Sequence, residues 1–316
     1  MKKLIKKIIL LGFYVFNLNN IEVFSQVDSG FVEVKNAVLF YRVWGNGEPI
    51  VFLNGGPGYA SNGYEVYATG IEKNRKVILF DQRGTGKSTM KRIGKPIYMS
   101  HMVDDLEALR KHLKIEKWDV FGHSFGGEYA LNYIHEYPKS IDKVILSATP
   151  GLGKSVYPFF QKFKNPKPES LTTLEIQLYH ELLKEKEKRN PDYERMYRIS
   201  LAMKARFYVS KPENYAIAAS WWLNKANPNI HAKAINNNIS GKNKSSLNRN
   251  FKQFTNNVLI IHGIGDFLNL SHPYANQELF PNAELIILQD AGHMMSIDSK
   301  EEYFNSINKF LDKTNQ

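Results

Sequence analysis

Apolar and polar residues alternate along the first part of the chain, and this alternation predicts strands. Residues 31–44 form two alternating segments separated by a Lys-Asn turn, and a Gly-Asn-Gly turn leads to a third apolar run over 49–53. A short, continuous apolar run follows at 76–80, of the kind shown by parallel strands that are buried on both faces of a sheet. Residues 117–122 and 142–148 are two further predicted strands.

Helical patterns separate these runs. Within residues 100–113, apolar side chains recur at helical spacing from Val103 to Leu113, and Ser100 is a candidate N-cap. Residues 124–137 form a second predicted helix, which ends at the following proline. Because strands alternate with helices, we expect an α/β fold with a mostly parallel sheet covered by helices.

The alternation stops at Pro150 and returns only after residue 250. The segment between is helical, aromatic and basic in character and ends in a polar, loop-like stretch. Strand-like runs resume at 257–263 and 284–290, before an amphipathic helix over about 300–313. We therefore expect one α/β core in two parts, residues 26–150 and 251–316, with a helical cap over residues 151–250 inserted between them.

The N-terminus has the pattern of an export signal. Four lysines within the first seven residues precede an apolar run of nine residues at 8–16, which is too short to span a bilayer. Val23 and Ser25 then occupy the −3 and −1 positions of a candidate cleavage site. We expect residues 1–25 to be a signal peptide and the mature protein to be exported, periplasmic or secreted, with no stable membrane span. The alternative is an uncleaved leader that anchors the chain.

The composition and the charge limit which kinds of site and partner the protein can have. The 316 residues include no cysteine, which excludes disulfides, thiolate nucleophiles and cysteine metal sites. The formal net charge is +11, and residues 151–250 alone carry 18 basic and 8 acidic residues. Such a segment suits an anionic substrate, a membrane surface or nucleic acid, or it consists of solvated lysines on helix surfaces. No nucleic-acid motif accompanies it, so we expect no nucleic-acid partner.

Residues 122–126 read Gly-His-Ser-Phe-Gly and fit the pattern Gly-x-Ser-x-Gly. The motif follows a strand-like run and opens a predicted helix, and in that context a sharp turn lifts the serine hydroxyl above the sheet. The alternative is an ordinary serine in a glycine-rich turn. We take Ser124 as the candidate nucleophile.

A serine hydroxyl is a weak nucleophile unless a base takes its proton. In this architecture the partners follow in the order serine, acid, histidine. Asp266 follows the run at 257–263 and His293 follows the run at 284–290, so both side chains can converge on Ser124. Asp266 would orient the imidazole of His293, which would carry the proton. Asp290 is a second candidate acid, but it lies too near His293 in sequence to fit easily.

An acyl-transfer site also needs N–H donors for the oxyanion. The turn Asn-Gly-Gly-Pro-Gly at 54–58 follows a predicted strand, and we assign one donor to Gly56. The second donor is the N–H of Phe125, the residue after the candidate nucleophile.

Residues 81–89, Asp-Gln-Arg-Gly-Thr-Gly-Lys-Ser-Thr, contain part of a phosphate-binding P-loop motif. The P-loop requires a glycine five residues before Gly86, and that position holds Asp81, whose carboxylate would repel phosphate. This argues against nucleotide binding. The histidines lack metal-ligand spacing, so we expect neither metal nor cofactor.

Together these motifs resemble the α/β-hydrolase superfamily, and within it the prolyl aminopeptidase (proline iminopeptidase) group, from about residue 31 to the C-terminus. The turn at 54–58 is similar to that group's His-Gly-Gly-Pro-Gly, with Asn54 in place of histidine. The segment from Asp81 is similar to the group's Asp-Gln-Arg-Gly-x-Gly-x-Ser. The resemblance implies that Asn54, Gly55, Asp81 and Arg83 support the active site.

The resemblance implies release of N-terminal proline from short peptides through an acyl-enzyme. That group binds the free amine with cap carboxylates, often near a Trp-x-x-Trp-Glu element, but here Trp221 and Trp222 are followed by Asn224. Glu194 and Glu213 are the candidate substitutes. The basic cap favours the alternative, a carboxylesterase or lactonase that acts on small or anionic acyl esters. A ligand receptor without catalysis is a third hypothesis.

Overall fold

The computed structural model describes residues 27–56, 58–71, 74–91, 97–152, 172–224 and 251–313. The predicted leader over residues 1–25 lies outside the described residues, as do residues 153–171 and 225–250 of the predicted cap. Of the helices in these ranges, none is both long enough and apolar enough to cross a membrane.

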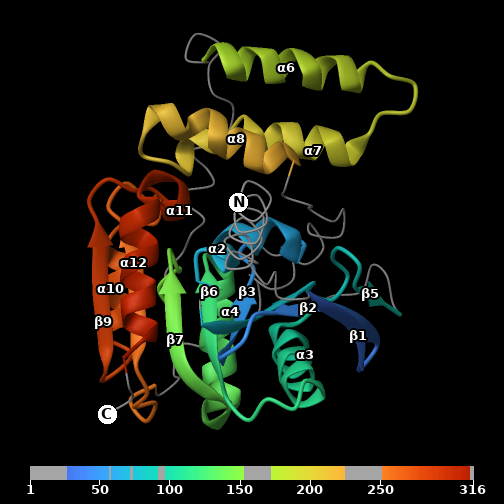
Figure 1. Cartoon of the computed structure of the whole chain (residues 1–316). Helices are drawn as coiled ribbons and strands as arrows, with labels where there is room; N and C mark the ends of the chain where they lie inside the picture. The colour runs from blue at the N-terminus through green and yellow to red at the C-terminus, as the bar shows by residue number, and fades with distance from the viewer. Residues whose placement is uncertain are drawn as a thin grey trace, which may run out of the picture.

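The described residues form a nine-stranded sheet at the centre of the molecule (Figure 1). One edge is antiparallel: β1 (Asp28–Val34) pairs with β2 (Ala37–Trp44), which also pairs with the short β5 (Thr89–Met90) and with β4. From there on the neighbours are parallel, in the order β4 (Arg75–Phe80), β3 (Glu48–Leu53), β6 (Trp118–His123), β7 (Ile141–Ser147), β8 (Val258–Gly263) and β9 (Ala283–Leu288). The mostly parallel sheet expected from the sequence is confirmed.

Helices cover both faces of the sheet, which explains why β6 and β8 are buried at every position. In β3, Val51 and Leu53 join one hydrophobic cluster, and Ile50 and Phe52 join the other. The first cluster includes side chains of α3 (Met99–His112) and α4 (Phe125–Glu136), and the second includes those of α2 (Glu65–Thr69) and α12 (Lys300–Leu311). Shorter elements are η1 (Ser61–Tyr64), η2 (Pro138–Ser140), α10 (Ser271–Gln277) and α11 (Met295–Asp298).

The expected N-cap of α3 is wrong by two positions. Tyr98 is the N-cap, with extended backbone angles and no side-chain cap hydrogen bond, and Ser100 lies inside the first turn. The earlier start brings Met99 into the helix, where its side chain is only 3% exposed. Burial of this apolar side chain is worth about 1.5–3 kcal/mol, more than a typical cap hydrogen bond at about 1 kcal/mol.

A helical region is inserted between β7 and β8 and lies beyond the carboxyl ends of the parallel strands (Figure 1). Its outer layer is α6, whose N-terminus has a capping box between Thr172 and Glu175. Below α6 lie α7 and α8, and side chains of these helices share a cluster with Tyr59 and Met294 of the core. The bounds are α6 (Thr173–Lys186), α7 (Tyr193–Ala202), η4 (Ala205–Phe207), η5 (Pro212–Asn214) and α8 (Tyr215–Asn224).

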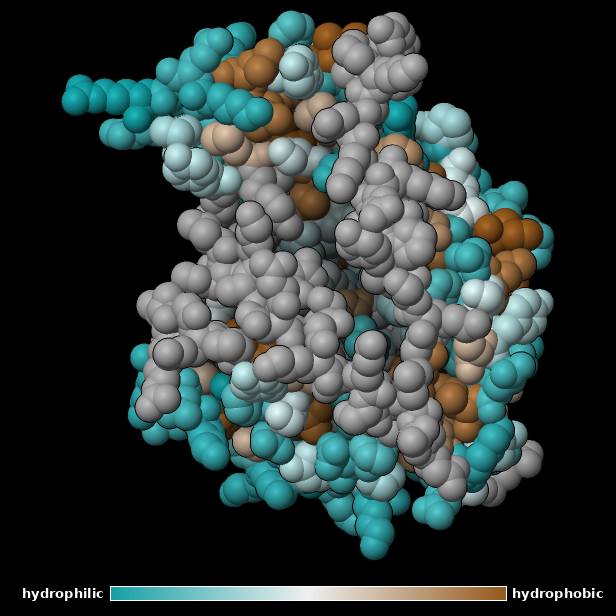
Figure 2. Space-filling model, turned by 180° about the vertical axis from the view of Figure 1, so that it is seen from behind, coloured by the Kyte–Doolittle hydropathy of each residue, from teal (hydrophilic) through white to brown (hydrophobic). Residues whose placement is uncertain are grey.

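The described surface seen in Figure 2 is mainly hydrophilic, and its apolar residues form several separate patches. The exposed large apolar side chains of the helical region include Ile176, Tyr179, Tyr193 and Ile217. The excess positive charge of this region therefore coexists with a surface that is partly apolar.

Candidate active site

Ser124 occupies the tight turn between β6 and α4, at the carboxyl end of its strand. Its backbone angles are φ 55° and ψ −124°, a conformation that costs a residue with a Cβ about 1–3 kcal/mol. Hydrogen bonds fix the turn: the Ser124 N–H donates to the Ser147 carbonyl at 2.9 Å, and the Gly127 N–H donates to the Ser124 carbonyl at 2.9 Å. Ser124 remains partly exposed, so its side chain is accessible.

The two glycines of the motif are required by close packing. A Cβ on Gly122 would lie 2.5 Å from the Gly126 carbonyl oxygen, and a Cβ on Gly126 would lie 1.9 Å from the Leu53 carbonyl oxygen. Both distances are far below van der Waals contact. The first turn of α4 can therefore approach β3 and β6 only because these positions are glycine.

Asp266 and His293 form a buried pair in the loops that follow β8 and β9. Nδ1 of His293 lies 3.0 and 2.9 Å from the two carboxylate oxygens of Asp266, and the Leu268 N–H donates to Oδ1 at 2.9 Å. Burial alone would raise the pKa of Asp266, but the adjacent His293 and these hydrogen bonds lower it below its ordinary value. An ionised carboxylate only accepts, so Nδ1 carries the proton and Nε2 is left as the basic nitrogen.

The loop of His293 lies beside the Ser124 turn. His123, the residue before Ser124, has its ring centroid 5.0 Å from that of His293. Within the described ranges no hydrogen bond joins the Ser124 hydroxyl to the His293 ring, and such contacts are often long before substrate binds. Asp290, the second candidate acid, is exposed, whereas Asp266 is buried against the imidazole.

The glycine turn after β3 lies directly against the candidate nucleophile, since a Cβ on Gly55 would be 3.0 Å from the Ser124 Cβ. The Gly55 N–H donates to the Tyr64 hydroxyl at 2.5 Å, so it is already engaged. Gly56 has φ 52°, and a Cβ there would lie 1.9 Å from the Tyr59 ring. These contacts leave the Gly56 N–H as the candidate oxyanion donor of this turn.

The supporting residues Asn54 and Asp81 organise loops around this turn. Asn54 is buried, donates from Nδ2 to the Tyr59 carbonyl at 3.3 Å, and accepts on its own carbonyl from Gln82. Asp81 accepts from the Ser61 N–H at 2.7 Å and from the Lys87 N–H at 2.8 Å.

Arg83, in the same loop, contacts residues of α3. It forms a two-pronged ion pair with Asp105 of α3, with nitrogen–oxygen distances of 2.6 and 2.5 Å. The Asp-Gln-Arg-Gly-Thr-Gly-Lys-Ser segment is therefore held by its own side chains, and Arg83 ties it to a helix that covers the sheet.

A family model of the alpha/beta hydrolase fold matches residues 48–300 of the chain. The chain belongs to the α/β-hydrolase family. Among curated proteins, the proline iminopeptidase of Clostridium botulinum is 26% identical to this α/β hydrolase over 312 residues, which cover 91% of this chain and 99% of that protein. The proline iminopeptidase of Clostridioides difficile is 35% identical over 129 residues, 39% of this chain and 44% of that protein.

Among solved structures, an esterase from Exiguobacterium antarcticum matches this α/β hydrolase with a TM-score of 0.66 at 18% identity, covering 90% of this chain and all of the esterase. These matches confirm the α/β-hydrolase fold expected from the sequence, including its helical insertion. They also bear out the resemblance to proteins named proline iminopeptidase.

His123, which precedes Ser124, connects two loops of the α/β hydrolase, and no local sequence pattern signals this role. Tyr64, which accepts from Gly55, lies 3.1 Å from Nδ1 of His123. Nε2 of His123 lies 3.1 Å from the His293 carbonyl oxygen and donates to it. Burial, with a smaller contribution from His293, lowers the pKa of His123 to about 3. A neutral imidazole thus bridges the glycine turn and the His293 loop.

This buried imidazole predicts a loss of stability in acid. In the unfolded chain His123 titrates near its ordinary pKa of about 6.5, whereas in the folded state it stays neutral down to about 3. Below about pH 6.5 the unfolded state binds the extra proton, so the free energy of unfolding falls by roughly 1.4 kcal/mol per pH unit. In urea unfolding at about pH 7 and about pH 5, we expect wild type to lose about 2 kcal/mol more than His123→Gln. Equal losses in both proteins would contradict this role.

Aromatic side chains from the cap region and from the loop after β8 surround the imidazole. The ring of Phe267 lies 4.2 Å from that of His293, and the ring of Tyr208 lies 5.6 Å away, edge-on. Trp222 of α8 contacts both Tyr208 and Tyr59, which places it between the His293 loop and the glycine turn. The wall of the site in this α/β hydrolase is therefore apolar and is partly built by the cap region.

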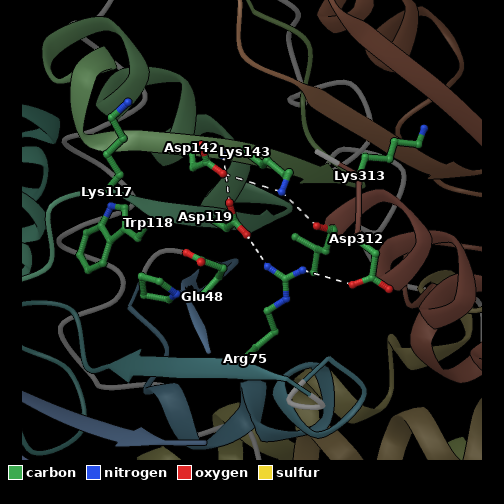
Figure 3. Close-up of a pocket in the computed structure, with 11 residues that line it drawn as sticks. Glu48, Arg75, Lys117, Trp118, Asp119, Asp142, Lys143, Asp312 and Lys313 are labelled. Atoms are coloured by element: carbon green, nitrogen blue, oxygen red, sulfur yellow. Dashed lines mark hydrogen bonds and ion pairs between the residues drawn. The ribbon is translucent and has the colours of Figure 1, made fainter. Parts of the chain in front are cut away.

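A pocket lies at the opposite, amino-terminal edge of the parallel strands (Figure 3). Several of its charged side chains pair with one another: Arg75 contacts Asp119 at 3.0 Å and Asp312 at 3.4 Å, and Lys143 contacts Asp142 at 3.7 Å. Lys143 also donates to the Leu311 carbonyl oxygen. These contacts anchor the end of α12 to the sheet, and this pocket is separate from the candidate active site.

Proposed function

We propose that this α/β hydrolase is a serine hydrolase that works through an acyl-enzyme and releases N-terminal proline from short peptides. The observation that carries the serine chemistry is the hydrogen-bonded Asp266–His293 pair beside the Ser124 turn. The match to the Clostridium botulinum proline iminopeptidase over nearly its whole length supports the prolyl substrate.

In the proposed reaction the Ser124 hydroxyl attacks the substrate carbonyl carbon while Nε2 of His293 takes its proton. Asp266 holds the resulting imidazolium in place through Nδ1. The N–H groups of Gly56 and Phe125 stabilise the oxyanion. His293 then gives the proton to the leaving amine, and the acyl-enzyme remains. Water, deprotonated by His293, attacks the acyl carbon and releases free acid and Ser124.

An ester substrate is the second candidate, and the charges of the cap favour it. A substrate ammonium needs a carboxylate partner when it is buried. In the described part of the cap, Glu175 lies 3.3 Å from Arg206 and Glu185 lies 2.6 Å from Lys188. Glu213, one of the two candidate amine ligands, is exposed, and the side chain of the other, Glu194, lies outside the described residues.

Two chromogenic substrates, a prolyl anilide and an ester, separate the candidates, and the N-acetylated anilide is the control. We expect the purified protein to release p-nitroaniline from proline p-nitroanilide, and to do so far more slowly from the N-acetylated compound, which lacks the ammonium group. Release from p-nitrophenyl butyrate without release from either anilide would replace the aminopeptidase proposal with an esterase.

A further inference from the structure

Residues 208–214 of the cap region lie directly against the loop that carries His293. A Cβ added to Gly292 would lie 3.0 Å from the Ser210 nitrogen and 3.1 Å from the Tyr208 carbonyl oxygen. The Met294 N–H donates to the same Tyr208 oxygen at 2.8 Å. The backbone that follows His293 is therefore fixed by the cap region.

The backbone that precedes His293 is held by Asp298, the last residue of α11. Oδ2 of Asp298 accepts one hydrogen bond from the Gly292 N–H at 2.8 Å and another from the Ser210 N–H at 2.7 Å. A single carboxylate oxygen thus joins the peptide next to His293 to the cap segment.

The other hydrogen bonds that Asp298 accepts also come from the cap segment. Its Oδ1 accepts from Asn214 Nδ2 at 2.9 Å and from the Lys211 N–H at 3.4 Å, and its carbonyl oxygen accepts from Lys211 Nζ at 2.9 Å. Asp298 is only 5% exposed. A carboxylate buried to this degree is costly unless several donors satisfy it, and here all but one of its donors belong to residues 210–214.

We propose that Asp298 is a positioning residue for His293. By fixing the Gly292 peptide it sets the place of the imidazole relative to Ser124, and by binding residues 210–214 it makes that place depend on the cap. The inference rests on the proposed function, because it takes His293 as the base. It holds for prolyl and ester substrates alike, since the proposed role concerns the position of His293 and not the identity of the acyl group.

The test is the rate at which a fluorophosphonate labels Ser124, measured across pH in wild type and Asp298→Asn. The asparagine keeps only one acceptor oxygen. Either the Gly292 and Ser210 N–H groups, which share Oδ2, or the Asn214 and Lys211 donors, which share Oδ1, therefore lose their acceptor. A displacement of about 1 Å at a reacting group costs about 100-fold in rate. We expect the labelling rate, and kcat for the chromogenic substrate that wild type hydrolyses best, to fall by roughly 10- to 100-fold with KM little changed.

Two further variants keep the result interpretable. Glu301→Gln removes an exposed carboxylate of α12 near Asp298 in sequence and should label like wild type. Asn214→Ala removes one cap donor but keeps the Gly292 hydrogen bond, and we expect a smaller decrease than for Asp298→Asn. If Asp298→Asn does not fold, Asn214→Ala provides the test of the Asp298 role. An Asn214→Ala protein that labels at the wild-type rate would then overturn the proposal.

The possible outcomes distinguish a failure of the Asp298 role from a failure of the proposed function. A folded Asp298→Asn protein, judged by circular dichroism, that labels at the wild-type rate and with the wild-type pH profile would overturn the role of Asp298 alone. A lower melting temperature without a change in these rates would do the same, since it would show a merely structural role. Failure of wild type to label would overturn the proposed function, and this inference with it.

Discussion

Replacing Ser124 with alanine is expected to lower kcat by about 10⁶-fold for whichever ester or prolyl substrate the protein hydrolyses. Without the hydroxyl no acyl-enzyme can form, and only the oxyanion donors and substrate binding remain to assist water. The measurement is steady-state hydrolysis of the better of the two chromogenic substrates, with active-site concentration checked by fluorophosphonate labelling of wild type.

Ser124→Gly is the matched control for this change. Alanine keeps the Cβ at φ 55° and therefore keeps the backbone strain, whereas glycine adopts this conformation without it. Both variants should be inactive, but the free energy of unfolding of Ser124→Gly should exceed that of Ser124→Ala by roughly 1 kcal/mol. A folded alanine variant with near wild-type kcat would show that another residue is the nucleophile.

The parts of this site that the sequence could predict are those fixed by local pattern. The glycines around Ser124 follow from close packing of a helix on its own strand, and the pattern of the strands predicts where that helix begins. Asp266 and His293 each lie in the loop that follows an apolar strand, and parallel strands bring such loops to one edge of the sheet. A short segment and the general rules of α/β folds are enough to predict each of these positions.

The parts that the sequence could not predict depend on contacts between distant segments. Asp298 lies 88 residues from Ser210, and Tyr64 lies 59 residues from His123, so no local pattern signals either hydrogen bond. The net charge of the cap segment adds up all of its residues, so it does not reveal that Glu175 pairs with Arg206.

Asp266→Asn is expected to lower kcat by about 10⁴-fold while leaving the protein folded. In wild type the carboxylate can only accept, and it holds the Nδ1 proton of His293 with contacts of 3.0 and 2.9 Å. An asparagine amide can instead donate to Nδ1, which moves the ring proton to Nε2 and removes the base. The measurement is kcat across pH with the substrate that wild type hydrolyses best.

Asp290→Asn provides the comparison that separates the two candidate acids. Asp290 is exposed, whereas burial and the His293 contacts distinguish Asp266, so we expect wild-type kcat from the Asp290 variant. The lowered pKa of Asp266 adds a second signature: its contribution to stability is present above its unfolded pKa of about 3.9 and is lost as the pH falls through the folded value. Asp266→Asn should therefore unfold more easily than wild type at neutral pH, and this difference should shrink in strong acid. If kcat fell in Asp290→Asn and not in Asp266→Asn, the acid would have been assigned to the wrong loop.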